Sequence, residues 1–143
     1  MANRIFYAGQ QLGFAQIGSN TFTAAHGVQS VGLNTTFNLE EVFELGQISL
    51  YENIEGTPDV EVTCEKVLDG YPSLYHLATR GASSATLSGR ATQKCIVGLS
   101  IFDDAQDAAS GTPLSQCTMS GMSVSSIAYS FPVDGNFTEQ LTL

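Results

Sequence analysis

Hydrophobic and polar residues alternate most regularly between Asp59 and Val67. Val60, Val62 and Cys64 fall on one side of this period-two pattern. The opposite side carries Asp59, Glu61, Thr63 and Glu65. Because successive side chains of a strand point to opposite faces of its sheet, the segment predicts a strand with an apolar core side and an acidic, solvated side.

Four other segments also have the pattern of strands. Residues 28–37 alternate and are rich in Val, Thr and Phe, which favours a half-buried strand. Residues 94–102 are mostly apolar, which predicts a strand covered on both faces. Residues 116–131 predict one long or bent strand, and residues 137–143 predict the last strand.

The segment 38–56 fits two patterns. Leu39, Val42 and Phe43 would share one face of a helix. A strand face would instead gather Phe37, Leu39, Phe43 and Leu45. We favour a long hairpin over 38–56, followed by a Gly- and Pro-containing turn at 55–59.

A short helix is predicted over residues 72–79. Pro72 is tolerated in a first helical turn. The apolar stripe of this helix consists of Leu74, Leu77 and Ala78. The segments 80–92 and 103–113 are rich in small and polar residues and are expected to be loops.

The N-terminal segment shows no lasting period. Residues 1–25 are rich in Gly and Gln and carry scattered aromatic residues. We therefore expect an N-terminal arm over 1–25 that becomes ordered by docking on a partner, and a single β domain over 26–143.

Length and charge narrow the class of protein. The chain has 143 residues, with five Lys and Arg against fourteen Asp and Glu. No apolar run approaches the roughly 18 residues of a spanning helix, and the N-terminus lacks a secretory signal, so we expect a soluble protein made in a cytoplasm. Its net charge of −9 argues against binding nucleic acid by neutralising phosphates. An acidic surface could either repel passing DNA or simply maintain solubility.

The chain lacks the usual constellations of catalysis. His26 and His76 lie far apart, and no phosphate-binding glycine loop or nucleophile elbow is present. Asp103, Asp104 and Asp107 miss the spacing of a calcium loop. We therefore expect no enzyme, no cofactor and no metal. Three cysteines without CxxC spacing predict free thiols in a reducing compartment, namely Cys64, Cys95 and Cys117.

The stretch 43–79 resembles the central block of phage tail tube proteins. It contains Phe43-Glu44-Leu45-Gly46-Gln47, Leu50-Tyr51-Glu52-Asn53-Ile54-Glu55 and Pro58-Asp59-Val60-Glu61-Val62-Thr63. It continues with Glu65-Lys66-Val67-Leu68-Asp69-Gly70-Tyr71-Pro72 and Leu74-Tyr75-His76-Leu77-Ala78-Thr79. The closing Gly135-Asn136-Phe137-Thr138-Glu139 is similar to the last strand of that family. The resemblance covers about a third of the chain.

This resemblance implies a mainly β fold, a β-sandwich or small barrel with one flanking helix. It further implies that six copies form a ring whose inner sheets join into one continuous channel barrel. Stacked rings would form the tail tube of a virion, the conduit for DNA ejection, assembled in the host cytoplasm without membrane insertion. The implied partners are other copies of the chain, a tape-measure protein in the lumen, the tail terminator, baseplate or tip proteins, and passing DNA. A sheath protein is left open.

Two sets of residues are candidates for this role. We expect Glu61 and Glu65 to line the channel, with Glu52 and Glu139 as weaker candidates, although the same carboxylates could line the outer surface. Within about 8 Å, the screening length at physiological salt, a carboxylate still repels a phosphate. Contacts between rings or subunits are expected from Phe6, Tyr7, Phe14, Phe43, Leu45 and Tyr51.

Two other readings stay open. The tube of a tailocin or of a contractile secretion system has the same architecture and cannot be separated by sequence. A monomeric or trimeric β-sandwich adhesin or receptor-binding module would instead have a discrete binding patch and would not assemble with itself.

Overall fold

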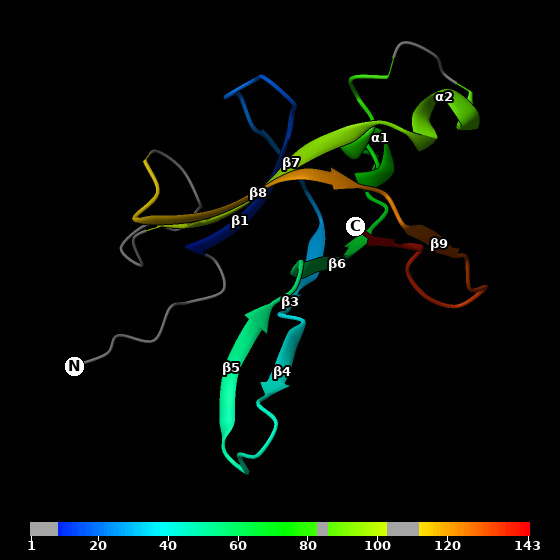
Figure 1. The fold of residues 1–143 in the computed structure, drawn as a ribbon. Helices are drawn as coiled ribbons and strands as arrows, with labels where there is room; N and C mark the ends of the chain where they lie inside the picture. The colour runs from blue at the N-terminus through cyan, green and yellow to red at the C-terminus, as the bar shows by residue number, and fades with distance from the viewer. Residues whose placement is uncertain (1–8, 83–85, 103–111) are drawn as a thin grey trace.

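The computed structural model describes residues 9–82, 86–102 and 112–143. In this part of the chain, ten strands form two four-stranded sheets and a separate hairpin, and every strand pairing is antiparallel (Figure 1). Two short helices accompany the sheets. The expectation of a mainly β fold is confirmed.

Sheet 1 has the order β2-β1-β7-β8. Its strands are β1 (Gln10–Gln16), β2 (Thr23–Ala24), β7 (Lys94–Ile101) and β8 (Ser115–Ser123). Sheet 2 has the order β3-β6-β10-β9. Its strands are β3 (Val28–Thr36), β6 (Asp59–Val67), β9 (Ser126–Ser130) and β10 (Thr138–Thr142).

One hydrophobic core joins the two sheets. Sheet 1 contributes Leu12, Phe14, Cys95 and Val97, and sheet 2 contributes Val62, Cys64 and Leu141. Helix α1 (Leu74–Ala78) adds Leu74, Leu77 and Ala78 to the same cluster. Burying each large aliphatic side chain contributes about 1.5–3 kcal/mol, so this shared core holds the sheets together as a sandwich.

The prediction of an N-terminal arm is wrong for those of its residues that the structure describes. Strand β1 pairs with β7 from Gln10 to Gln16, inside sheet 1. Gly13 and Gly98 are partners in that pairing, and the Phe22 ring covers them both; a Cβ on Gly98 would lie 2.7 Å from the ring. Because β1 is covered on both faces, it shows no hydrophobic period. Residues 1–8 lie outside the described part.

The segment predicted as one long strand divides between the sheets. Strand β8 belongs to sheet 1 and strand β9 to sheet 2, with only two residues, Val124 and Ser125, between them. The chain therefore crosses from one layer of the sandwich to the other at this point, as corner-forming strands do in packed sheets.

Other predicted elements are confirmed, with one helix added. The strands at 28–37, 59–67, 94–102 and 137–143 are present as β3, β6, β7 and β10, and the hairpin over 38–56 is present as β4 (Leu39–Phe43) and β5 (Leu50–Glu55).

The predicted helix is α1, which starts after the N-cap Ser73 rather than at Pro72. The predicted loop 80–92 contains a second helix, α2 (Leu87–Ala91), capped by Thr86. Most of the predicted loop 103–113 lies outside the described residues.

Candidate assembly interface

The face of sheet 2 that points away from the core is polar across all four strands. The strand registers place Asn34 beside Glu61, and Ser30 and Gln140 beside Glu65. We call this surface the polar face; it consists of Ser30, Gly32, Asn34, Thr36, Asp59, Glu61, Thr63, Glu65, Val67, Ser126, Ala128, Ser130, Thr138, Gln140 and Thr142. Apart from Gln140 and Val67, its side chains are small or acidic, and its charges are all negative. The predicted alternation of β6 is thereby confirmed: Val62 and Cys64 are buried, and Glu61 and Glu65 are exposed.

Charge is distributed unevenly along the subunit. Residues 27–65 contain no Lys, Arg or His. Eight carboxylates lie there, at Glu40, Glu41, Glu44, Glu52, Glu55, Asp59, Glu61 and Glu65. The accessible Lys and Arg side chains of the described residues are Arg80, Arg90 and Lys94. They lie on α1, α2 and the start of β7 or next to them, at the end of the molecule opposite the β4–β5 hairpin (Figure 1). The subunit therefore has an acidic end and a basic end.

Sheet 2 has two edges that are open in the single chain. Among the described strands, β3 pairs only with β6, and β9 pairs only with β10. Unpaired strand edges present free backbone N–H and C=O groups and are templates for pairing with another chain. Since the four strands alternate in direction, β9 of one copy and β3 of a rotated neighbour would run antiparallel. The sheet can therefore continue from copy to copy.

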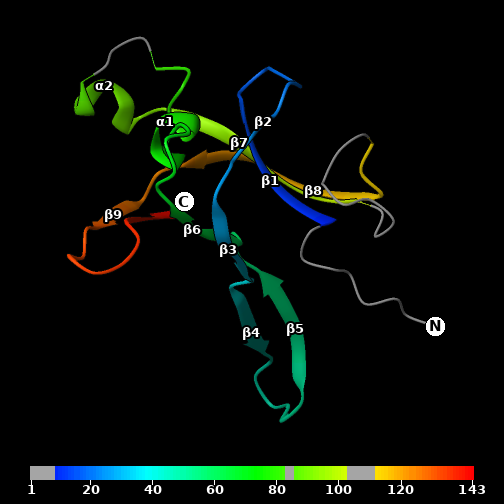
Figure 2. The same ribbon diagram turned by 180° about the vertical axis from the view of Figure 1, so that it is seen from behind.

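The β4–β5 hairpin projects from the body of the subunit (Figure 2). Three predicted contact residues, Phe43, Leu45 and Tyr51, are exposed on it. Its other exposed apolar residues are Leu39, Ile48 and Ile54. Isolated two-stranded hairpins are marginally stable in water, and clustered exposed apolar residues mark interaction surfaces. The hairpin thus has the properties of a segment that another molecule covers. Glu52, a predicted channel residue, is also exposed on it.

Hydrogen bonds close the base of the hairpin, between the end of β3 and the start of β6. The Gly56 N–H donates to the Asn38 carbonyl oxygen at 2.6 Å, and the Asn38 Nδ2 donates to the Thr57 carbonyl oxygen at 2.9 Å. A Cβ on residue 56 would lie 2.5 Å from the Asn38 carbonyl oxygen, so the close approach requires glycine. These bonds fix where the hairpin leaves β3 and enters β6.

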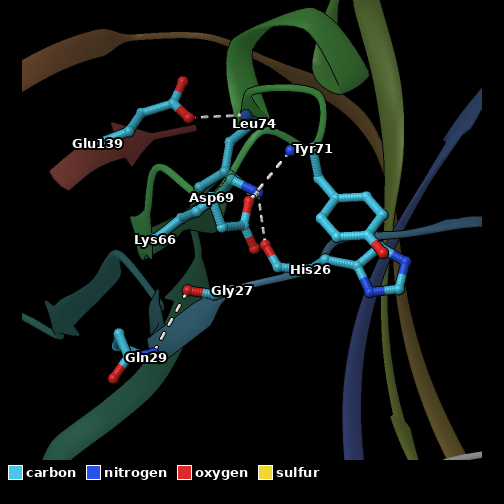
Figure 3. Close-up of polar contacts among 8 residues, drawn as sticks. All are labelled: His26, Gly27, Gln29, Lys66, Asp69, Tyr71, Leu74 and Glu139. Atoms are coloured by element: carbon cyan, nitrogen blue, oxygen red, sulfur yellow. Dashed lines mark hydrogen bonds and ion pairs between the residues drawn. The ribbon is translucent and has the colours of Figure 1, made fainter. Parts of the chain in front are cut away.

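Glu139 does not lie on the polar face, so its prediction as a channel residue is wrong. Its side chain is fully buried, with 0% exposure. Oε2 accepts the Leu74 N–H at 2.8 Å (Figure 3). Oε1 accepts the Tyr75 N–H at 3.1 Å and the Tyr129 hydroxyl at 3.2 Å. The carboxylate therefore binds the first turn of α1 and attaches that helix to β9 and β10. Burial and the Glu139 carboxylate raise the pKa of Tyr129.

A buried lysine stands behind the polar face. Lys66 on β6 is fully buried, and its Nζ donates to the His26 carbonyl oxygen at 2.6 Å and to Asp69 Oδ1 at 2.9 Å (Figure 3). The hydrogen bond from Lys66 lowers the pKa of the Asp69 carboxyl, as does that from the Tyr71 N–H. The Tyr71 ring stacks on His26 at 4.3 Å. Sequence reasoning missed this cluster, although Lys66 continues the buried period of β6.

The remaining predicted residues divide into three groups. Phe14 is 2% exposed in the core and cannot be a contact residue, while Phe6 and Tyr7 lie outside the described residues. Cys64 and Cys95 are buried free thiols, and Cys117 is exposed. Within the described residues, no three His, Cys, Asp or Glu side chains are placed to bind a metal ion, and none of the helices there is long and apolar enough to span a membrane.

The fold is shared with chains of a prophage particle. This chain is similar to one in the cryo-EM structure of the anti-feeding prophage baseplate, 6-fold symmetrised, with a TM-score of 0.68 and 12% identity over 99% of this chain and 91% of that chain. It is also similar to one in the structure of the anti-feeding prophage cap, the tube terminating cap, with a TM-score of 0.67 and 14% identity over 99% and 87%. At these identities the likeness establishes the fold. No family model and no curated protein matches the sequence.

Proposed function

We propose that this chain is a structural subunit of the tube of a phage tail or phage-like injection machine. In this proposal six copies form a ring, sheet 2 faces the channel, and rings stack into a tube. The observation that carries the proposal is sheet 2 itself, which combines two open edges with a small, polar and acidic outer face. The fold shared with anti-feeding prophage chains supports the proposal, as does the sequence resemblance to tail tube proteins.

Ring closure follows from the strand pattern. Each copy supplies four alternating strands, so six copies give 6 × 4 = 24 strands in one antiparallel barrel. With strands about 4.8 Å apart and tilted about 40°, such a barrel has a backbone radius of about 24 Å. Barrels of 16–18 strands already leave an aqueous channel. The proposed ring therefore has a wide lumen, and its channel-lining sheet 2 has no free strand edge.

The composition of the polar face suits a channel wall that lets DNA pass without binding it. Glu61 and Glu65 are exposed on it, and the face carries no base that could bind a phosphate. Repetition in every copy would give the lumen a uniform negative field, which keeps anionic DNA from adhering to the wall. The face also lacks bulky apolar side chains that would hold a protein cargo.

A charge reversal tests the channel position. The paired change Glu61→Lys and Glu65→Lys alters the charge by +4 per subunit, and we expect tubes to assemble, to retain duplex DNA in a salt-dependent way and to slow its ejection. Asp134→Lys, on an exposed loop between β9 and β10, is the control for added positive charge. Tubes of the paired variant that neither bind DNA nor change ejection kinetics would place the polar face outside the lumen.

A second candidate is a subunit that closes an end of such a tube. It is favoured by one observation: the two similar chains belong to structures described as a baseplate and as a tube terminating cap. An end subunit would form single rings, whereas a tube subunit stacks on itself. The length of the assemblies formed by the pure protein separates the two.

A further inference from the structure

The tip of the β4–β5 hairpin is apolar, acidic and fully exposed. It turns at Gly46, whose φ of +95° favours glycine. Leu45 and Ile48 beside it are 102% and 101% exposed, so they contact nothing within the chain. Glu44 precedes Leu45 directly. A turn that holds bulky apolar side chains wholly in water is a costly arrangement for a single subunit.

A cavity lies at the other end of the molecule. It has a volume of about 230 Å³ and lies between the β1–β2 connection and α1. Phe14, Ala15 and Leu77 form its apolar part. Arg80 lines its polar part, with the guanidinium Nη1 donating to Thr23 Oγ1 at 3.0 Å, together with Gln16, Ser19, Thr21 and Thr23. An apolar cavity of about 150 Å³ accommodates a benzene molecule. The space is therefore sufficient for a leucine side chain.

The tip and the cavity cannot meet within one chain. Strands β3 and β6 lead from the cavity end to the hairpin end, as both ribbon views show (Figures 1 and 2). The nine residues of β6 alone span about 30 Å at roughly 3.3 Å per residue. A second copy placed head to tail would bring its hairpin tip to this cavity. Because such a contact joins different surfaces, copies translated along one axis repeat it without closing and build a filament.

Charge complementarity supports a second copy as the occupant. Within the described residues, Lys66 and Asp69 form an ion pair, and Arg80 pairs with no carboxylate there. The hairpin carries five carboxylates and no base, whereas the accessible Lys and Arg side chains of the described residues lie near the cavity end. Bringing the acidic end of one copy to the basic end of the next is thus favourable, and the opposite orientation would juxtapose like charges.

We propose that Leu45 of one copy enters the cavity beside Arg80 of a copy in the adjoining ring, and that Glu44 of the first copy pairs with that Arg80. This docking rests on the proposed tube function, and it adds the site that receives the hairpin tip of the neighbouring copy. The apolar contact would supply stability, and the ion pair would set the orientation of stacking. Since an exposed ion pair is screened by salt, tubes should shorten as salt is raised.

Four variants test this docking: Leu45→Asn, Glu44→Arg, Arg80→Glu, and Glu44→Arg combined with Arg80→Glu. Each single change should leave rings intact and reduce tube length at least tenfold by electron microscopy, and the combined reversal should restore tubes. Val133→Asn and Asp134→Arg are the controls, because Val133 is an equally exposed apolar residue and Asp134 an exposed carboxylate away from the hairpin.

The outcomes distinguish the docking from the function. Tubes of normal length from Leu45→Asn or Arg80→Glu would overturn the docking while the tube function stands, and so would a combined reversal that fails to restore tubes. Wild-type protein that forms neither rings nor tubes would overturn the proposed function itself. Because Leu45 contacts nothing within the subunit, the Leu45→Asn variant tests stacking without a folding defect.

Discussion

Replacing Glu139 should destabilise the subunit, because its carboxylate is fully buried and holds helix α1 in place. Its buried carboxylate accepts three hydrogen bonds, from the Leu74 and Tyr75 N–H groups and from the Tyr129 hydroxyl. Glu139→Ala removes all three acceptors. Glu139→Gln keeps the size of the side chain, but its NH₂ group must face one of the two α1 N–H donors, because an amide has a single acceptor oxygen.

The size of the effect follows from the burial of each donor. Leaving the buried Leu74 N–H without a partner costs about 1–3 kcal/mol, and losing the bonds to the half-buried Tyr75 and Tyr129 costs about 0.5–1 kcal/mol each. We therefore expect Glu139→Ala to lower the free energy of unfolding by about 3 kcal/mol, and Glu139→Gln by about 2 kcal/mol. For a domain of this size, about 3 kcal/mol corresponds to a melting temperature lower by about 12 °C.

Urea denaturation, followed by circular dichroism at low protein concentration, measures this effect without a contribution from self-assembly. Glu65→Gln is the matched control, because Glu65 is an exposed carboxylate on β6 and should change stability by less than about 0.5 kcal/mol. If Glu139→Gln were as stable as Glu65→Gln, the attachment of α1 by the carboxylate would be refuted.

Two further predictions concern titratable groups. The pKa of Asp69 is lowered by Lys66, so its contribution should be complete above the unfolded pKa of about 3.9 and disappear as the pH falls through the lower folded value. Urea midpoints measured between pH 2 and 7 should show that loss of stability in the wild type. The Asp69→Asn variant should be less stable at neutral pH and should lack that part of the pH dependence. Curves of midpoint against pH that run parallel for the two proteins would contradict this. Burial raises the pKa of Cys64 to about 12 and that of Cys95 to about 11, so iodoacetamide at pH 8 should label only Cys117 in the native protein and all three thiols in urea. Mass spectrometry that finds two or three labels on the native protein would contradict the described core.

Sequence patterning predicted the strands that have one solvent-exposed face. In β6, polar residues alternate with the buried Val62 and Cys64, so the strand and its acidic face were both predictable. Strand β1 has Leu12 and Phe14 in the core and Phe22 over its other face, so no alternation marks it and its sequence favours an arm. The crossing of β8 into β9 was missed because no strong turn signal separates the two strands.

The buried polar residues show what the alternation within a single strand can predict and what it cannot. Alternation through Leu141 and Leu143 places Glu139 on the core side of β10, and alternation through Val62 places Lys66 on the core side of β6. That signal could have excluded Glu139 from the channel. Its hydrogen-bond partners on α1 lie 64 and 65 residues away in sequence, and only the fold brings them together.

Cryo-electron microscopy of the concentrated, purified protein tests the central claim most directly. The account predicts six-fold rings in which β9 of each copy pairs with β3 of its neighbour, and in which Glu61 and Glu65 face the lumen. Particles that remain monomeric at every concentration, or rings that turn these carboxylates to the outside, would contradict it.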